Sequence, residues 1–211
     1  MSDFRYVSKS EYAQAQYEVL DLLHLVQDEV RDKFTFRYEF VGSVKRNMVT
    51  MDYSSNIGYD FDVNIYVNDD DENYSAQEIC DILRNGFDKF NRIFSYDYTE
   101  DSTRVLTIKV KDKKKSRILH SVDFAIVYDC NDGSRQYIRF NKVRQEYQWV
   151  FQDNPYQVEE RINLIKANRL WQAVRERYLE KKNYNPMQKK SRTLFAETIN
   201  DIYTKYFNYS E

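Results

Sequence analysis

The chain has 211 residues, of which 42% are hydrophobic and 31% charged, as expected for one substantial globular domain or a domain with a helical appendage. Its formal net charge of −2 provides no global basic field, so composition does not indicate non-specific nucleic-acid binding. Four Gly and two Pro argue against long flexible linkers. The sequence contains no apolar signal core and no apolar stretch long enough to span a membrane. Cys80 and Cys130 are interpreted as small buried thiols of a reducing compartment, so we expect a cytoplasmic protein.

The first half of the chain predicts two helices and several strands. Residues 9–33 carry apolar side chains at helical spacing, with Ser8 or Ser10 as the N-cap. A second helix is predicted over residues 75–94, which open with a Ser-x-x-Glu capping box. Strands are predicted, in chain order, at 34–41, 58–67, 103–110, 117–129 and 135–140. The third and fourth of these flank the polar turn KDKKKS and should form an antiparallel hairpin.

The pattern becomes helical from Asn154 onward. Residues 158–178 have apolar side chains at helical spacing, NYNP interrupts the pattern, and residues 188–207 predict a last helix. We therefore expect an α+β protein with no internal repeat. Its two predicted parts are a core with an N-terminal helix (1–153) and a C-terminal helical subdomain packed on it (154–211).

Two carboxylates stand out in the second strand. Asp60 and Asp62 share one face because strand residues i and i+2 do, while Phe61 and Val63 fill the opposite face. Asp123 is a third carboxylate in an apolar strand, HSVDFAIV. If the strands are neighbours, the three aspartates can hold two Mg²⁺ ions about 3.5–4 Å apart. The alternative is that they lie on a solvated sheet face or pair with Lys and Arg side chains.

A Gly-Ser turn strengthens the functional interpretation of these aspartates. Gly42 permits positive φ or a close backbone approach, and Ser43 adds a hydroxyl. The following VKRNM could open a helix whose N–H groups face an anion.

Three motifs in the chain resemble, in the same order, those of the nucleotidyltransferase superfamily typified by DNA polymerase beta. They are FVGS (40–43), DFDV (60–63) and VDFA (122–125). The resemblance implies a mixed β-sheet flanked by helices, with Asp60 and Asp62 binding two Mg²⁺ ions, which Mn²⁺ can replace. Asp123 would bind one ion and help to activate an acceptor hydroxyl. The Gly42–Ser43 turn would hold the nucleotide phosphates.

The C-terminal half extends this resemblance. Two segments resemble the central helical domain of oligoadenylate-synthetase-like and terminal RNA nucleotidyltransferases: NLIKANRLW (163–171) and QKKSRTLFAETINDIY (188–203). The resemblance implies that the chain is a minimal member of this group. In those families a helix lysine and a serine opening a later helix touch the triphosphate, which implies Lys166 and Ser191 here. The alternatives are an ordinary surface lysine and an ordinary polar helix residue, and we prefer the phosphate role because a lysine and a hydroxyl at a helix start both suit a polyphosphate.

One stretch departs from the family pattern. Asp60 follows Ser43 by seventeen positions, a longer connection than usual, and the Gly and Thr that often follow the Gly-Ser pair are absent. Lys45 or Arg46 could supply the missing phosphate contacts.

The leading hypothesis is a Mg²⁺-dependent nucleotidyltransferase that moves an NMP from an NTP to a hydroxyl and releases pyrophosphate. ATP is the expected donor, and the acceptor is a small molecule, a nucleotide or an RNA end. The alternative is a non-catalytic nucleotide-binding or interaction module of the antitoxin type, which the presence of all three aspartates disfavours. No DNA-binding motif and no membrane partner are indicated. The basic run KVKDKKKSR is interpreted as a solvated turn, because charge runs usually mark exposed tips, and the alternative is a contact with nucleic-acid phosphates.

Overall fold

The computed structural model describes residues 2–152 and 156–207, and the chain divides into two compact units. The sheet unit comprises Tyr6–Met51 and Asn56–Gln152, and the helical unit comprises Met1–Arg5, Asp52–Ser55 and Asp153–Glu211. The predicted boundary between residues 153 and 154, and the change of pattern at Asn154, lie outside the described residues.

The sheet unit is built on a seven-stranded mixed sheet with the central order β2-β4-β7-β6-β5, to which β8 is added on β7 and β9 on β8. Only β4 and β7 pair in parallel, and the other pairs are antiparallel. The strands are β2 (Thr35–Val41), β4 (Tyr59–Asn68), β5 (Glu100–Asp101), β6 (Leu106–Asp112), β7 (Arg117–Asp129), β8 (Arg135–Asn141) and β9 (Glu146–Phe151). A separate two-stranded sheet pairs β1 (Phe4–Tyr6) with β3 (Thr50–Asp52).

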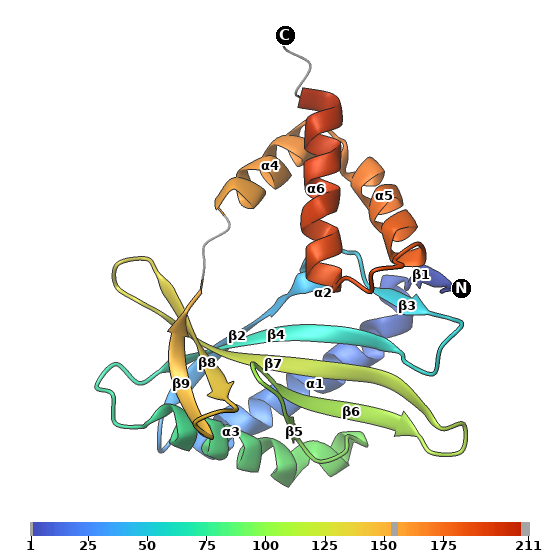
Figure 1. Cartoon of the computed structure of the whole chain (residues 1–211). Helices are drawn as coiled ribbons and strands as arrows, with labels where there is room; N and C mark the ends of the chain where they lie inside the picture. The colour runs from blue at the N-terminus through green and yellow to red at the C-terminus, as the bar shows by residue number, and fades with distance from the viewer. Residues whose placement is uncertain (1, 153–155, 208–211) are drawn as a thin grey trace. The chain divides into compact units, whose positions relative to one another are not determined.

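Two long helices, α1 (Lys9–Val30) and α3 (Ala76–Phe90), lie on the same face of this sheet, as Figure 1 shows. Every second residue of the central strands is buried against them in one hydrophobic core. The two helices approach closely at Gly86, where an added Cβ would lie 3.1 Å from Val26 Cγ1. Phe87 of α3 stacks on Phe124 of β7 with ring centroids 4.3 Å apart. This packing fixes which face of each strand is buried.

Both helices begin where the sequence predicts. Glu11 accepts hydrogen bonds from the Ser8 backbone N–H at 2.8 Å and from the Ser8 hydroxyl at 2.6 Å, so Ser8 is the N-cap. Ser75 and Glu78 form the same reciprocal box at the start of α3. The second predicted helix ends earlier than expected, because α3 gives way to the 3₁₀ turn η1 (Asn91–Phe94).

The predicted α+β class is confirmed, as is the antiparallel pairing of β6 with β7. Four short or edge strands, β1, β3, β5 and β9, were not predicted. Strands of two or three residues carry too little alternation to be recognised. The edge strand β9 has the sequence EYQWVF, and all six of its residues are partly or fully exposed, so it lacks the buried apolar face that marks the central strands.

The helical unit contains α4 (Tyr156–Ala167), α5 (Trp171–Asn183) and α6 (Ser191–Phe207). The helical pattern predicted over 158–178 is thus two helices, separated by a turn in which Arg169 has φ +60°. Within this unit Phe195 of α6 makes edge-on contacts with the rings of Trp171 and Tyr178. No helix in residues 2–152 or 156–207 combines the length and hydrophobicity needed to cross a bilayer.

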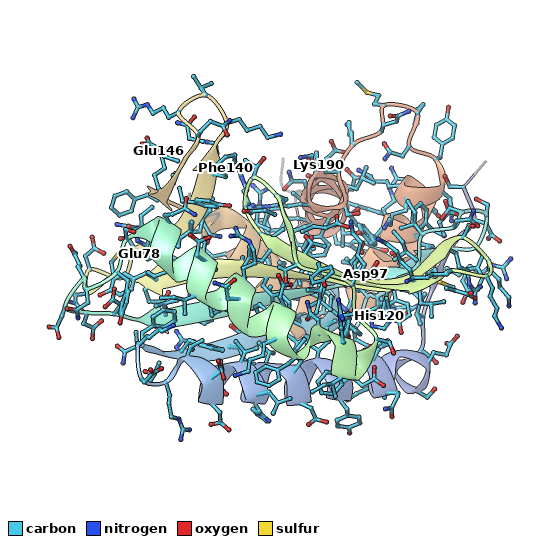
Figure 2. All side chains as sticks on the ribbon, turned by 90° about the horizontal axis from the view of Figure 1, so that it is seen from below. Glu78, Asp97, His120, Phe140, Glu146 and Lys190 are labelled. Carbon is cyan, nitrogen blue, oxygen red and sulfur yellow. The ribbon has the colours of Figure 1, made fainter. Side chains whose placement is uncertain are left out.

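A histidine is buried on the helix-covered face of the sheet. His120 of β7 lies towards the end of α3 opposite Glu78 (Figure 2), and only 6% of its surface is exposed. Its ring stacks on Tyr59, and its Nε2 shares a hydrogen bond of 3.0 Å with Tyr96 Oη. Burial lowers the pKa of His120 to about 4, and the charge of Glu18 only partly opposes this.

We predict that His120 makes the protein acid-sensitive. Its unfolded-state pKa of about 6.5 exceeds the folded value, so the unfolded chain binds the extra proton and stability falls as pH drops from about 6.5 to about 4. His120→Gln should reduce the loss of unfolding free energy between about pH 7 and about pH 4.5 by about 2 kcal/mol, measured by urea denaturation. His24→Gln, at the exposed second histidine, is the control. Equal acid sensitivity in all three proteins would contradict this assignment.

Candidate active site

The two aspartates of β4 face away from the helix-covered core. Phe61 and Val63 are 0% and 1% exposed in the core, so strand alternation places Asp60 and Asp62 on the opposite face. Asp60 is exposed and Asp62 is partly buried. The predicted common orientation of this pair is therefore what the fold produces.

The parallel pairing of β4 with β7 brings the third aspartate alongside. Asp62 is the register partner of Asp123, and Asp60 is the partner of Ser121. Neighbouring strands lie about 4.8 Å apart, and directly paired residues share a face. The three aspartates therefore occupy one patch on the open face, which we call the carboxylate patch (Asp60, Asp62, Asp123).

The Gly-Ser turn closes against this patch. Val41, the last residue of β2, is the register partner of Asp62, and the one-turn helix α2 (Gly42–Lys45) follows at once. Gly42 has φ +61°, and an added Cβ would lie 2.0 Å from Asp62 Oδ2. Only glycine satisfies both conditions. The backbone N–H of Ser43 then donates a hydrogen bond to the Asp62 carboxylate.

Two side chains that the sequence analysis did not select hold the other two carboxylates. The Ser121 hydroxyl donates to Asp60 Oδ1, and the Thr107 hydroxyl of β6 donates to Asp123 Oδ1 at 2.6 Å. Each aspartate thus has its own donor. Ser121 could have been found from its place two residues before Asp123, but Thr107 depends on the register between β6 and β7, which the sequence does not specify.

The electrostatics of the patch favour a cation. Burial raises the pKa of Asp62, and the charges of Asp123 and Asp60 raise it further, against the opposing effects of Arg46 and the Ser43 N–H. Burial also raises the pKa of Asp123, the Thr107 hydrogen bond lowers it and the charge of Asp60 raises it. Asp62 and Asp123 are therefore desolvated and are repelled by neighbouring carboxylates, a cost that a bound positive ion would reduce.

The donor chemistry of the patch fits a hard divalent ion, because all three side chains offer carboxylate oxygens. Within residues 2–152 and 156–207, however, no three His, Cys, Asp or Glu side chains converge tightly enough to hold a metal ion as they stand. A cation would have to draw these side chains towards it.

The remaining predicted phosphate contacts are distributed over both units. Lys45 makes a 2.5 Å ion pair with Glu39, and Arg46 acts electrostatically on Asp62. Lys166 is exposed on α4 with its Nζ 5.0 Å from the centre of the Trp171 ring, and Ser191 is the exposed first residue of α6. Lys166 and Ser191 belong to the helical unit, so their contact with nucleotide stays a prediction.

Comparison with known proteins places this geometry in a familiar fold. No protein-family model and no curated protein matches the chain. The Vibrio cholerae cyclic AMP-GMP synthase DncV, solved with the linear intermediate 5' pppA(3',5')pG, aligns with a TM-score of 0.60 and 16% identity over 92% of this chain and 54% of that chain. The GTP-bound form of DncV aligns with a TM-score of 0.56 and 18% identity, over 92% of this chain and 52% of that chain. The Bradyrhizobium diazoefficiens CD-NTase CdnG, in complex with GTP, aligns with a TM-score of 0.53 and 11% identity, over 74% of this chain and 42% of that chain.

The chain has the fold of these nucleotidyltransferases. At such low identity the likeness establishes the fold alone, and the chain spans about half the length of the structures that it matches. The expected likeness to the nucleotidyltransferase superfamily is thus confirmed at the level of fold.

The repulsion within the carboxylate patch predicts the effect of removing one charge. Asp62→Asn should leave the metal-free unfolding free energy at about pH 7 unchanged or raise it by up to about 1 kcal/mol, because a desolvated and repelled charge is lost. Asp129→Asn is the matched control, since it removes a strand aspartate paired with Arg37 and Arg135, and should lower stability slightly. Urea denaturation in the presence of a chelator measures both. A loss above about 2 kcal/mol for Asp62→Asn would mean that this carboxylate holds the fold together.

Proposed function

We propose that the chain is a metal-dependent nucleotidyltransferase that transfers an NMP from an NTP to a hydroxyl acceptor and releases pyrophosphate. The observation that carries the proposal is the carboxylate patch on a nucleotidyltransferase fold, with the Gly42 turn held against Asp62. At Gly42 any side chain would collide with the Asp62 carboxylate. A patch with a purely structural role would not require the backbone to turn so close to a carboxylate.

The chemistry assigned to this site is an in-line displacement at the α-phosphorus. The acceptor oxygen forms a bond to that phosphorus, the bond to the oxygen bridging to the β-phosphate breaks, and pyrophosphate leaves with the electron pair. The proton of the acceptor hydroxyl passes to the Asp123 carboxylate, whose Oδ1 is already held by Thr107. Asp123 is partly desolvated, which favours its acting as a proton acceptor.

The resident cofactor in this proposal is Mg²⁺, bound as two ions by Asp60, Asp62 and Asp123, with Mn²⁺ as a substitute. Such ions supply charge neutralisation on the phosphate oxygens and lower the pKa of a bound hydroxyl. Asp60 and Asp62 position the donor, and the Gly42–Ser43 turn allows the phosphates to approach the backbone closely. The roles of Lys45 and Arg46 as phosphate contacts are part of the same proposal.

Two residues of the helical unit are part of the proposal as nucleotide contacts. Lys166 and Ser191 would bind the β- and γ-phosphates, because a lysine and a hydroxyl at a helix start both suit a polyphosphate. The helical half of the proposal rests on the resemblance to oligoadenylate-synthetase-like and terminal nucleotidyltransferases.

ATP is our proposed donor, and a nucleotide is the acceptor that the similar structures favour. DncV is a cyclic AMP-GMP synthase that has been solved with a linear pppA(3',5')pG intermediate, and CdnG has been solved with GTP. A small molecule or an RNA end remains an alternative acceptor, because the chain covers only about half of those proteins.

The direct test supplies the protein with each NTP, labelled at the α-phosphate, together with Mg²⁺ or Mn²⁺ and either a second NTP or a cell extract. We expect label to move to an acceptor with release of pyrophosphate. Asp60→Asn and Asp123→Asn should each reduce the rate at least about a thousand-fold, since both remove a proposed metal ligand. Asp129→Asn, whose carboxylate pairs with Arg37 and Arg135, should retain the rate.

Two results would contradict the proposal. Release of inorganic phosphate without transfer of the α-label would indicate a hydrolase. NTP binding without turnover in any combination of metal and acceptor would support the alternative of a non-catalytic nucleotide-binding or interaction module.

A further inference from the structure

The side chain of Thr107 occupies a position fixed by the core. Its neighbours on β6, Leu106 and Ile108, are 1% and 0% exposed in the core, so Thr107 must point to the opposite face. The register then sets Thr107 directly opposite Asp123. A slip of one residue would turn a buried Leu or Ile to the open face, so this pairing is strongly specified.

The contact between these two side chains is short and directional. Thr107 Oγ1 lies 2.6 Å from Asp123 Oδ1, in the range of a hydroxyl bound to a charged carboxylate. Because Thr is branched at Cβ, its side chain has restricted rotation and the hydroxyl is held in place. Among the contacts within the described residues, this is the one side-chain hydrogen bond to Asp123. One carboxylate oxygen is therefore occupied and the other left available.

We propose that Thr107 is a positioning residue that orients Asp123, so that Oδ2 faces the cation and the acceptor hydroxyl. This inference rests on the proposed nucleotidyl transfer and adds a residue outside the three aspartates and the Gly-Ser turn. Without the hydroxyl, the Asp123 carboxylate rotates about its terminal bond and both oxygens compete for the same ligand. Removing a hydrogen-bond partner that orients a metal-binding side chain typically lowers metal affinity or activity by about 10–100-fold.

The neighbouring side chains do not replace this hydroxyl. Lys109, the next residue of β6 on the same face, makes an ion pair with Glu100, and its charge reaches Asp123 without a hydrogen bond. Ser121 donates to Asp60. The orientation of Asp123 thus depends on Thr107 itself.

The test uses the full chain and Mn²⁺ alone as the probe, with free Mn²⁺ followed by electron paramagnetic resonance. Thr107→Val preserves shape and removes the hydroxyl, and it should weaken Mn²⁺ binding by about 10-fold. The turnover number for NMP transfer should fall by about 10–100-fold with little change in the KM for NTP. Thr107→Ser should restore most of both, to within about 3-fold of the native protein, because the hydroxyl returns without the restricting methyl group.

Two reference variants separate the outcomes. Thr35→Val removes an exposed hydroxyl of β2 that contacts Asn68, and should behave as the native protein. Asp123→Asn should abolish transfer. Native-like Mn²⁺ affinity and turnover in Thr107→Val, with Asp123→Asn inactive, would overturn the role of Thr107 and leave the proposed function standing. Failure of the native protein to bind Mn²⁺ or to transfer NMP would overturn both.

Discussion

The parallel pairing of β4 with β7 is the constraint on which this account depends. It sets Asp62 beside Asp123 and Asp60 beside Ser121, while the alternation of each strand sends Phe61, Val122 and Phe124 into the core. A slip of one residue would bury the carboxylates and expose the aromatic side chains. The hydrophobic core under α1 and α3 therefore specifies the geometry of the open face.

Stability and the proposed function are opposed on that open face. Desolvated carboxylates on adjacent strands repel one another, and the raised pKa values of Asp62 and Asp123 report this cost. Local donors offset part of it, because the Ser43 N–H, the Ser121 hydroxyl and the Thr107 hydroxyl each bind one carboxylate. A cation with its bound nucleotide would offset the rest, so the arrangement is one in which ligand binding and folding stability are coupled.

The sequence was sufficient to predict the main helices, the central strands and the common face of Asp60 and Asp62, because each follows from local periodicity. The motif order suggested the fold, and the Gly42 turn proved to lie against Asp62. Thr107 was not predicted because its partner depends on the register of β6 on β7, a non-local property. The break at Arg169 was missed because its positive φ arises in a turn without Gly or Pro. The proposed roles of Lys166 and Ser191 stay predictions, because both residues belong to the helical unit.

The central claim is that the carboxylate patch and the Gly-Ser turn form one joint site for metal and nucleotide. Thermal unfolding measured with Mg²⁺ alone, ATP alone and both together tests it most directly, with Asp62→Asn in parallel. We predict that the two ligands together raise the melting temperature by several degrees more than the sum of their separate effects, because the phosphates complete the metal shell. The excess should vanish in Asp62→Asn. Additive shifts in the native protein, or an equal excess in the variant, would contradict the claim.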